Sequence, residues 1–305
     1  MSLVGITSPR SSPGATSLAV GLAMAWQDWG LSPLLVEADP AGGVLGHRFN
    51  ITGSRANRTL LSFAVDSRRG FTGQALANNV QQIAGIETLL APLDPAKASQ
   101  AVDRSAQSLI EHSEENERPI MVDLGRIQPG SPALKLARAC DMVLVVLEPR
   151  IDQVQSSLFQ LASLRQQGLV PELVLVGSGE FDPADIAASS DASIAAVLPK
   201  SPKTAVALSG GSYRRGAFNR SPLWRSIAAL ARGLADTIII SPSASLAPPT
   251  EPPTAPPSPP PTAPPPPPPS ALPDEVWAEP AEPDVQDQEP ALKVWVPAAE
   301  EAIDD

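Results

Sequence analysis

Cysteine, histidine and tyrosine are scarce in this 305-residue sequence, which holds one Cys, two His and one Tyr. The single cysteine, Cys140, excludes a disulfide framework within the chain. The histidines, His47 and His112, have no partner at the spacing of metal ligands, so the sequence predicts no zinc site. No apolar run reaches the roughly 18 residues that cross a membrane, and the first residues lack the pattern of a secretion signal. We therefore expect a soluble, cytoplasmic protein.

Basic residues are fewer than acidic ones, and the net charge is −11. The excess of acidic residues lies in the C-terminal part of the sequence. Residues 241–305 hold 12 carboxylates against Lys293, which leaves 21 acidic and 21 basic residues before them. A neutral body has no general attraction for nucleic acid or an anionic membrane. We interpret its one basic concentration as solvated surface, with non-specific DNA or anionic-surface contact as the alternative. This concentration comprises Arg214, Arg215, Arg220 and Arg225, with Lys200 and Lys203 nearby.

Proline is concentrated after position 240, where 21 of the 36 prolines lie. Proline fixes φ and lacks an N–H, so 241–270 is predicted to be extended polyproline II. The sequence thus predicts a folded domain over 1–240 and a disordered, acidic, proline-rich tail over 241–305. Trp277 and Trp295 stand out there, since exposed aromatic side chains are favoured anchors for protein partners. The alternative is that they are chance residues in a spacer.

The first 240 residues alternate short apolar runs with segments of helical period, a pattern typical of a parallel sheet with crossover helices. Strands are predicted at 3–7, 34–38, 87–90, 119–123, 142–147, 172–176 and 194–198. Helices are predicted at 16–29, 73–84, 96–112, 131–137, 153–167 and 222–238. This is a doubly wound α/β sheet, and such sheets bind ligands at the carboxyl ends of their strands.

A polar loop joins the first predicted strand to the first predicted helix, with the sequence Arg10-Ser11-Ser12-Pro13-Gly14-Ala15-Thr16-Ser17. In this context backbone N–H groups and a helix N-terminus can cradle phosphate. Taken alone, the loop fits an ordinary capped turn equally well.

Four later segments, taken in their order along the chain, favour a phosphate-binding interpretation of the loop. They are Leu34-Leu35-Val36-Glu37-Ala38-Asp39-Pro40-Ala41-Gly42-Gly43, Pro119-Ile120-Met121-Val122-Asp123-Leu124-Gly125, Asp141 to Pro149, and Val197-Leu198-Pro199-Lys200. With the loop, these segments resemble the motifs of the ParA/MinD-type (SIMIBI class) P-loop ATPase family over roughly residues 3 to 235. The resemblance implies that family's α/β fold.

The loop departs from the family pattern Lys-Gly-Gly-x-Gly-Lys-Thr-Thr and resembles a degenerate Walker A motif. The family lysine that contacts the β and γ phosphates is replaced by Ala15. Losing such a charge-assisted hydrogen bond costs about 1.5–3 kcal/mol, or on the order of 10- to 100-fold in affinity. Arg10 replaces the lysine that reaches the partner's phosphates in a dimer, and it keeps the charge with a different geometry. Ser11, Ser12 and Pro13 further depart from the flexible, donor-rich loop.

The resemblance also implies a set of site residues for ATP and Mg²⁺. Thr16 and Asp123 would hold the metal, and Asp39 would position the attacking water, with Arg10 acting in trans. Ser12, Pro13, Gly14, Ala15, Thr16, Ser17 and Pro199 would surround the nucleotide. Each polar residue has a structural alternative: Thr16 as a helix cap, Asp123 as a loop cap, and Asp39 as part of an Asp-Pro turn.

Three functions stay open at this point. The first is a degenerate ParA/MinD-like protein with weak or no ATP hydrolysis that positions or regulates a partner complex. The second is an active ATPase that forms a nucleotide-dependent homodimer through Arg10. The third is a scaffold that binds no nucleotide and acts through its tail. The basic amphipathic segment 222–238 is interpreted as the last packed helix, with membrane targeting as the alternative.

Overall fold

The computed structural model describes residues 3–9, 13–69, 72–115 and 118–240. Arg10, Ser12 and the whole predicted tail, with Trp277 and Trp295, lie outside the described residues. The boundary between domain and tail therefore stays a prediction.

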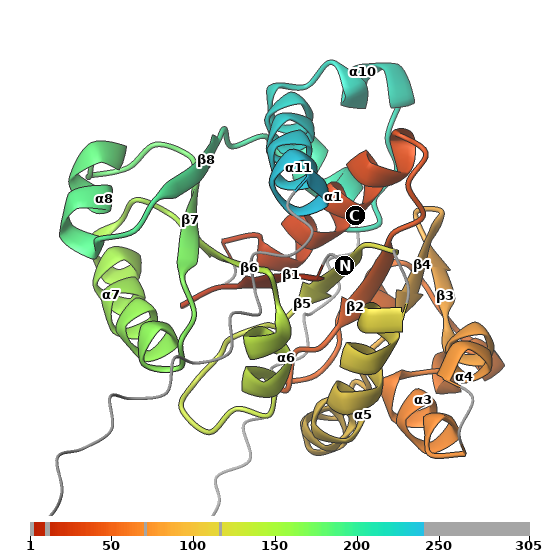
Figure 1. Ribbon diagram of the computed structural model, residues 1–305. Helices are drawn as coiled ribbons and strands as arrows, with labels where there is room; N and C mark the ends of the chain where they lie inside the picture. The colour runs from red at the N-terminus through yellow and green to blue at the C-terminus, as the bar shows by residue number, and fades with distance from the viewer. Residues whose placement is uncertain (1–2, 10–12, 70–71, 116–117, 241–305) are drawn as a thin grey trace, which may run out of the picture. The chain divides into compact units, whose positions relative to one another are not determined.

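The described strands form one eight-stranded sheet in the order β3-β4-β2-β5-β1-β6-β7-β8 (Figure 1). All neighbouring strands are parallel except β3 and β4. The strands are β1 (Leu3–Thr7), β2 (Leu34–Glu37), β3 (Gln81–Ile83), β4 (Ile86–Leu89), β5 (Ile120–Asp123), β6 (Met142–Leu147), β7 (Pro171–Val176) and β8 (Ile194–Leu198). The doubly wound fold is confirmed, and each predicted strand is correct to within one residue at either end.

Helices cover both faces of the sheet. They are α1 (Ala15–Asp28), α2 (Leu45–Arg48), α3 (Leu60–Ser67), α4 (Thr72–Asn79), α5 (Pro95–Glu115), α6 (Ala133–Ala139), α7 (Ile151–Gln166), α8 (Pro183–Ser190), α9 (Pro202–Leu208), α10 (Arg215–Asn219) and α11 (Pro222–Ile240), with the 3₁₀ helix η1 (Gly53–Asn57). The helix predicted over 73–84 is wrong at its end, because residues 81–83 form β3. Gln81 and Ile83 are buried and Gln82 is exposed, which is the two-residue period of a strand.

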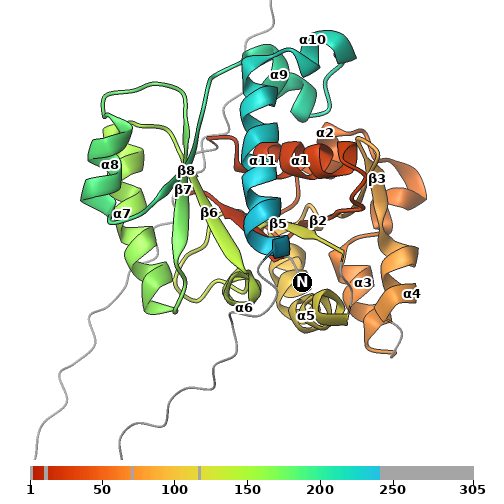
Figure 2. The same ribbon diagram turned by 45° about the horizontal axis from the view of Figure 1, so that its top comes forward.

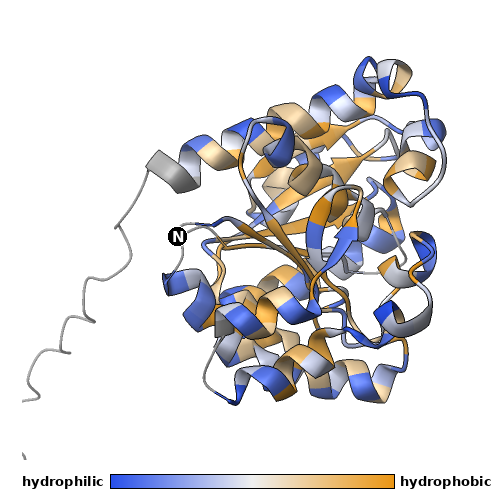
Figure 3. Ribbon diagram, turned by 90° about the vertical axis from the view of Figure 1, so that its right-hand side faces the viewer, coloured by the Kyte–Doolittle hydropathy of each residue, from blue (hydrophilic) through white to orange (hydrophobic). Residues whose placement is uncertain are grey.

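Two apolar cores lie on the two faces of the sheet. One joins the sheet to α1, α9, α10 and α11, and the other joins it to α3 through α8 (Figure 2). The strands are apolar along their length while the helices turn polar residues outward (Figure 3). Residues of α11 such as Ile227 and Ala231 are buried, and the Trp26 Nε1–H donates to the Ala231 carbonyl at 2.9 Å. The prediction that 222–238 is a packed helix is confirmed.

Candidate functional site

The loop after β1 leads into α1 through a left-handed turn. Gly14 has φ 109°, a conformation that favours glycine, and its carbonyl accepts the first helical hydrogen bond from Leu18 N–H at 2.8 Å. Ala15, the first residue of α1, is 6% exposed and brings no charge to this position. The predicted strand and helix are therefore in place, and the described part of the loop from Pro13 leads to a helix N-terminus, which is a favourable position for an anion.

Three predicted site residues converge beside this loop. β2 and β5 are parallel neighbours in which Glu37 lies opposite Asp123, so residues at their carboxyl ends meet. The Thr16 hydroxyl donates a hydrogen bond to the Asp123 carboxylate. Burial raises the pKa of Asp123 to about 6, while bonds from Thr16 and the Gly125 N–H oppose the rise and nearby Asp39 adds to it. The fold thus brings together Thr16 and Asp123, which lie more than one hundred residues apart in the sequence.

Asp39 lies directly after β2 and rests on the loop that follows β5. Its Oδ1 accepts a hydrogen bond from Ala41 N–H at 2.8 Å, and burial raises its pKa while the Ala41 bond and the Arg126 charge lower it. Gly125 has φ +59°, and a Cβ on it would overlap the Asp39 carboxyl group. The Gly125 carbonyl in turn accepts a hydrogen bond from the Thr7 hydroxyl at 2.8 Å. Only glycine permits this approach, so Gly125 links β1 to Asp39.

Glu37 is the site residue that sequence reasoning missed. Its side chain is 1% exposed, and its carboxylate accepts hydrogen bonds from Val44 N–H at 2.6 Å, Leu45 N–H at 2.8 Å and Ala91 N–H at 3.1 Å. Burial raises its pKa to about 7 in spite of these bonds, and the nearby Asp123 charge adds to the rise. Glu37 therefore ties the segment after Asp39 to the segment after β4. The sequence did contain a signal for Glu37, because a charged residue inside the apolar run 34–38 indicates a buried carboxylate that needs hydrogen-bond partners.

A cavity of about 310 Å³ opens on the other side of the loop. Of the predicted nucleotide contacts, it is lined by Pro13, Gly14, Ser17 and Pro199. Its remaining wall combines apolar residues of β8, α9 and α11 with an ion pair between Lys200 Nζ and Glu148 Oε1 at 2.9 Å. This ion pair was not predicted. Glu148 follows β6 and Lys200 follows β8, and the sequence does not show that the ends of these two strands lie close together.

The predicted metal ligands suit Mg²⁺ in chemical type, because the Thr16 hydroxyl and the Asp123 carboxylate are hard oxygen donors. Among the described residues, no three His, Cys, Asp or Glu side chains gather in a way that could hold a metal ion. A magnesium ion beside Thr16 would therefore need phosphate oxygens and water to complete its shell. Within the same part of the chain, no helix is long and apolar enough to span a bilayer.

No protein-family model matches the sequence, and no curated protein matches it significantly. Solved structures do resemble the fold. A ParA family ATPase from Chlorobium tepidum TLS has a TM-score of 0.64 and 18% identity, over 76% of this chain and 98% of that chain. MinD complexed with Mg-ADP from Pyrococcus horikoshii OT3 has a TM-score of 0.64 and 18% identity, over 78% and 98%.

The MinC:MinD cell division protein complex from Aquifex aeolicus also resembles this chain, with a TM-score of 0.57 and 15% identity over 77% of this chain and 95% of that chain. Sequence identity this low establishes likeness of fold, and the motif order agrees with it. The chain has the fold of the ParA/MinD-type P-loop ATPases.

Proposed function

We propose that the chain is a degenerate ParA/MinD-like protein that binds a nucleotide with Mg²⁺ weakly, hydrolyses it little or not at all, and positions or regulates a partner complex. The observation that carries this proposal is Ala15. It stands buried at the first turn of α1, where a lysine would otherwise meet the phosphates. Without that cation, the charge that develops on a transferring phosphoryl group lacks its nearest stabilising partner.

The rest of the site supports retained binding. Gly14 keeps the turn, the two proposed metal ligands Thr16 and Asp123 interact with each other, and a pocket lies beside Gly14. The helix N-terminus at Ala15 still offers backbone N–H groups to an anion. These features fit a protein in which ligand occupancy, rather than turnover, carries the signal.

Calorimetric titration of the full chain with Mg-ADP and Mg-ATP, followed by an assay for released phosphate, tests this proposal. Ala15→Lys should tighten ADP binding on the order of 10- to 100-fold, because it restores a charge-assisted contact. Ala15→Met is the matched control, since it adds a chain of similar length without charge. The proposal fails if the wild-type protein turns over ATP at a rate that Asp39→Ala abolishes, or if neither nucleotide binds.

An active ATPase is the second candidate, and the retained Asp39 favours it. Its carboxyl lies against Gly125 at the carboxyl ends of β2 and β5, near Asp123. In this reading Arg10, which lies outside the described residues, supplies the missing charge from a second copy. Phosphate release that rises steeply with protein concentration and is lost in Arg10→Ala would select this candidate.

We further propose that residues 241–305 recruit the partner, with Trp277 and Trp295 as anchors. Large aromatic residues are frequent binding hot spots, and the surrounding carboxylates would favour a basic partner surface. Truncation before Ser241 should leave the melting temperature of the body unchanged and abolish partner capture. Trp277→Ala with Trp295→Ala should reproduce the loss in the full chain, and unchanged capture by this variant would refute the assignment.

A further inference from the structure

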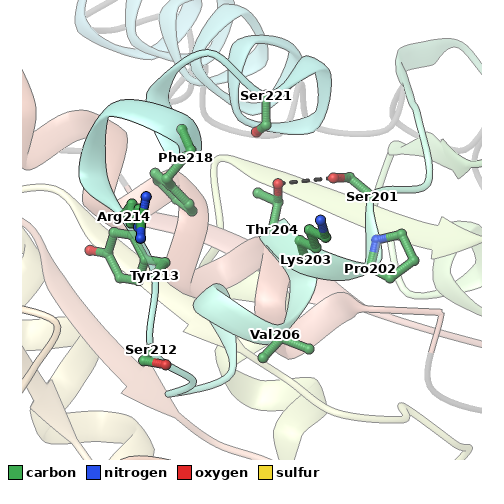
Figure 4. A pocket seen from close by; sticks show the side chains of 11 residues that line it. Ser201, Pro202, Lys203, Thr204, Val206, Ser212, Tyr213, Arg214, Phe218 and Ser221 are labelled. Carbon is green, nitrogen blue, oxygen red and sulfur yellow. Dashed lines mark hydrogen bonds between the residues drawn. The ribbon is translucent and has the colours of Figure 1, made fainter.

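A second cavity lies apart from the loop at Gly14, between α9, α10 and Ser221, the residue before α11. Its volume is about 560 Å³, which is within the range of small-molecule sites (Figure 4). It borders the 310 Å³ pocket along one edge only, where Ser201 and Pro202 line both cavities. The other lining residues come from segments that the family motifs do not include.

The turn that forms one wall of this cavity is held in place by two glycines. Gly210 has φ +90°, and a Cβ on it would overlap the Arg48 carbonyl. Gly211 N–H donates to the Val206 carbonyl at 2.9 Å, at the end of α9. The wall at Tyr213 is therefore fixed against two other segments, and the cavity does not depend on an unanchored loop.

A cluster of three tilted aromatic rings lies at one side of the cavity, and two of them, Tyr213 and Phe218, line it. The rings of Tyr213 and Phe218 have centroids 4.7 Å apart, and those of Phe218 and Trp224 are also 4.7 Å apart. Phe218 and Trp224 are 5% and 7% exposed, whereas Tyr213 is 47% exposed. The buried rings thus hold Tyr213 at the edge of the cavity, where part of its surface remains accessible to a flat ligand.

Two cations lie at opposite sides of this cavity. Arg214 lies beside Tyr213, and Lys203 lies across from them on α9 (Figure 4). Within the described part of the chain, neither makes an ion pair, although neighbouring Arg215 contacts Asp28 at 3.7 Å. The cavity therefore offers positive charge that the described chain does not neutralise, next to an exposed ring.

We propose that this cavity is a binding site for a small organic anion with a planar apolar body, of the aromatic carboxylate class. The ring of the ligand would stack near Tyr213, and its carboxylate would lie within reach of Lys203 and Arg214. The hydroxyls of Ser201 and the buried Thr204, which are 2.9 Å apart, add polar groups to the cavity lining. The proposal goes beyond nucleotide binding and does not depend on it.

Calorimetric titration of the full chain with 2-naphthoate tests the proposal, with 2-naphthamide as the uncharged ligand of the same shape. Saturable one-to-one binding of 2-naphthoate, at least tenfold tighter than 2-naphthamide, is expected. The double variant Lys203→Gln, Arg214→Gln and the variant Tyr213→Ala should each weaken 2-naphthoate binding at least tenfold, whereas Tyr213→Phe should retain it. The matched control, Arg220→Gln with Arg225→Gln, removes two nearby charges from outside the cavity and should leave the affinity unchanged.

Several outcomes overturn the proposal. They are the absence of saturable binding, equal affinity for the amide, or equal loss in the Arg220 and Arg225 control. Competitive displacement by Mg-ADP would place the naphthoate in the nucleotide pocket instead. If duplex oligonucleotide binds and the Lys203 and Arg214 variant abolishes that binding while naphthoate does not bind, the surface is a nucleic-acid contact. Melting temperatures within the wild-type range verify that each variant is folded, and the double variant Lys203→Gln, Arg214→Gln keeps the test decisive if Tyr213→Ala does not fold.

Discussion

Glu37 makes the stability of this protein depend on pH in a direction that is unusual for a carboxylate. Its pKa is raised from 4.5 to about 7, chiefly by burial. Because the folded state holds this proton to a higher pH than the unfolded chain, the free energy of unfolding falls as pH rises between those two values. Integrated from pH 5 to pH 8, the loss from Glu37 is on the order of 2–3 kcal/mol.

Glu37→Gln removes this titration but also replaces the oxygen that accepts the Ala91 N–H. An amide nitrogen cannot accept that bond, which costs about 1–3 kcal/mol at every pH. The variant should therefore be less stable than the wild type at pH 5 and nearly equal to it at pH 8. Asp123, whose pKa is also raised, titrates in both proteins and largely cancels from the difference.

Urea unfolding at pH 5, 6, 7 and 8 measures this difference, provided that the slope with denaturant stays constant. Glu111→Gln, on the exposed face of α5, is the matched control and should follow the wild type at each pH. A stability difference between Glu37→Gln and wild type that does not change with pH would refute the reasoning. So would a difference that grows with pH, since the three N–H bonds would then outweigh burial and favour the charged form.

Two further substitutions test the geometry of the site. Gly125→Ala should lower the free energy of unfolding by more than about 2 kcal/mol, because it combines positive φ with overlap on Asp39. Gly130→Ala separates the two effects in the same chemical denaturation assay, since Gly130 has φ +79° but nothing within 4 Å of the added carbon, and it should cost less. If nucleotide induces a dimer, Arg10→Glu should abolish it in sedimentation velocity. An unaltered dimer would exclude the Arg10 loop from the interface.

The parallel strands were predictable because their burial leaves a clear signal. β1, β5 and β6 are nearly continuous apolar runs, as strands covered on both faces must be. The short edge strand β3 was not predicted, because its three residues carry two glutamines and its pairing with β4 is set by tertiary contact. Short helices leave a weak periodic signal: α3 and α9 were missed, whereas α6, which also has seven residues, was predicted at 131–137.

The residues of the candidate site that belong to a sequence motif could be predicted. Those that reach the site only through the folding of the chain could not. Thr16, Asp39 and Asp123 were named from the sequence and lie together at the carboxyl ends of the central strands. Glu37 was overlooked because a strand-end carboxylate is usually solvated, and its three backbone donors come from segments 7 to 54 residues away. Cross-strand geometry of this kind has no local signature in the sequence.

The central place of β1 in the sheet sets the order in which this protein can be completed during synthesis. Leu3 is paired with Ile120, and Val4 is paired with Met142, so β1 lacks both neighbours until more than one hundred further residues have been translated. At about 5–20 residues per second, the wait is on the order of 10 seconds. During that interval the apolar β1 segment has neither of its native neighbours, and unpaired strand edges of this kind can pair with other chains. The central position of β1, which stabilises the finished sheet, therefore leaves the nascent chain with an apolar strand whose two edges close late.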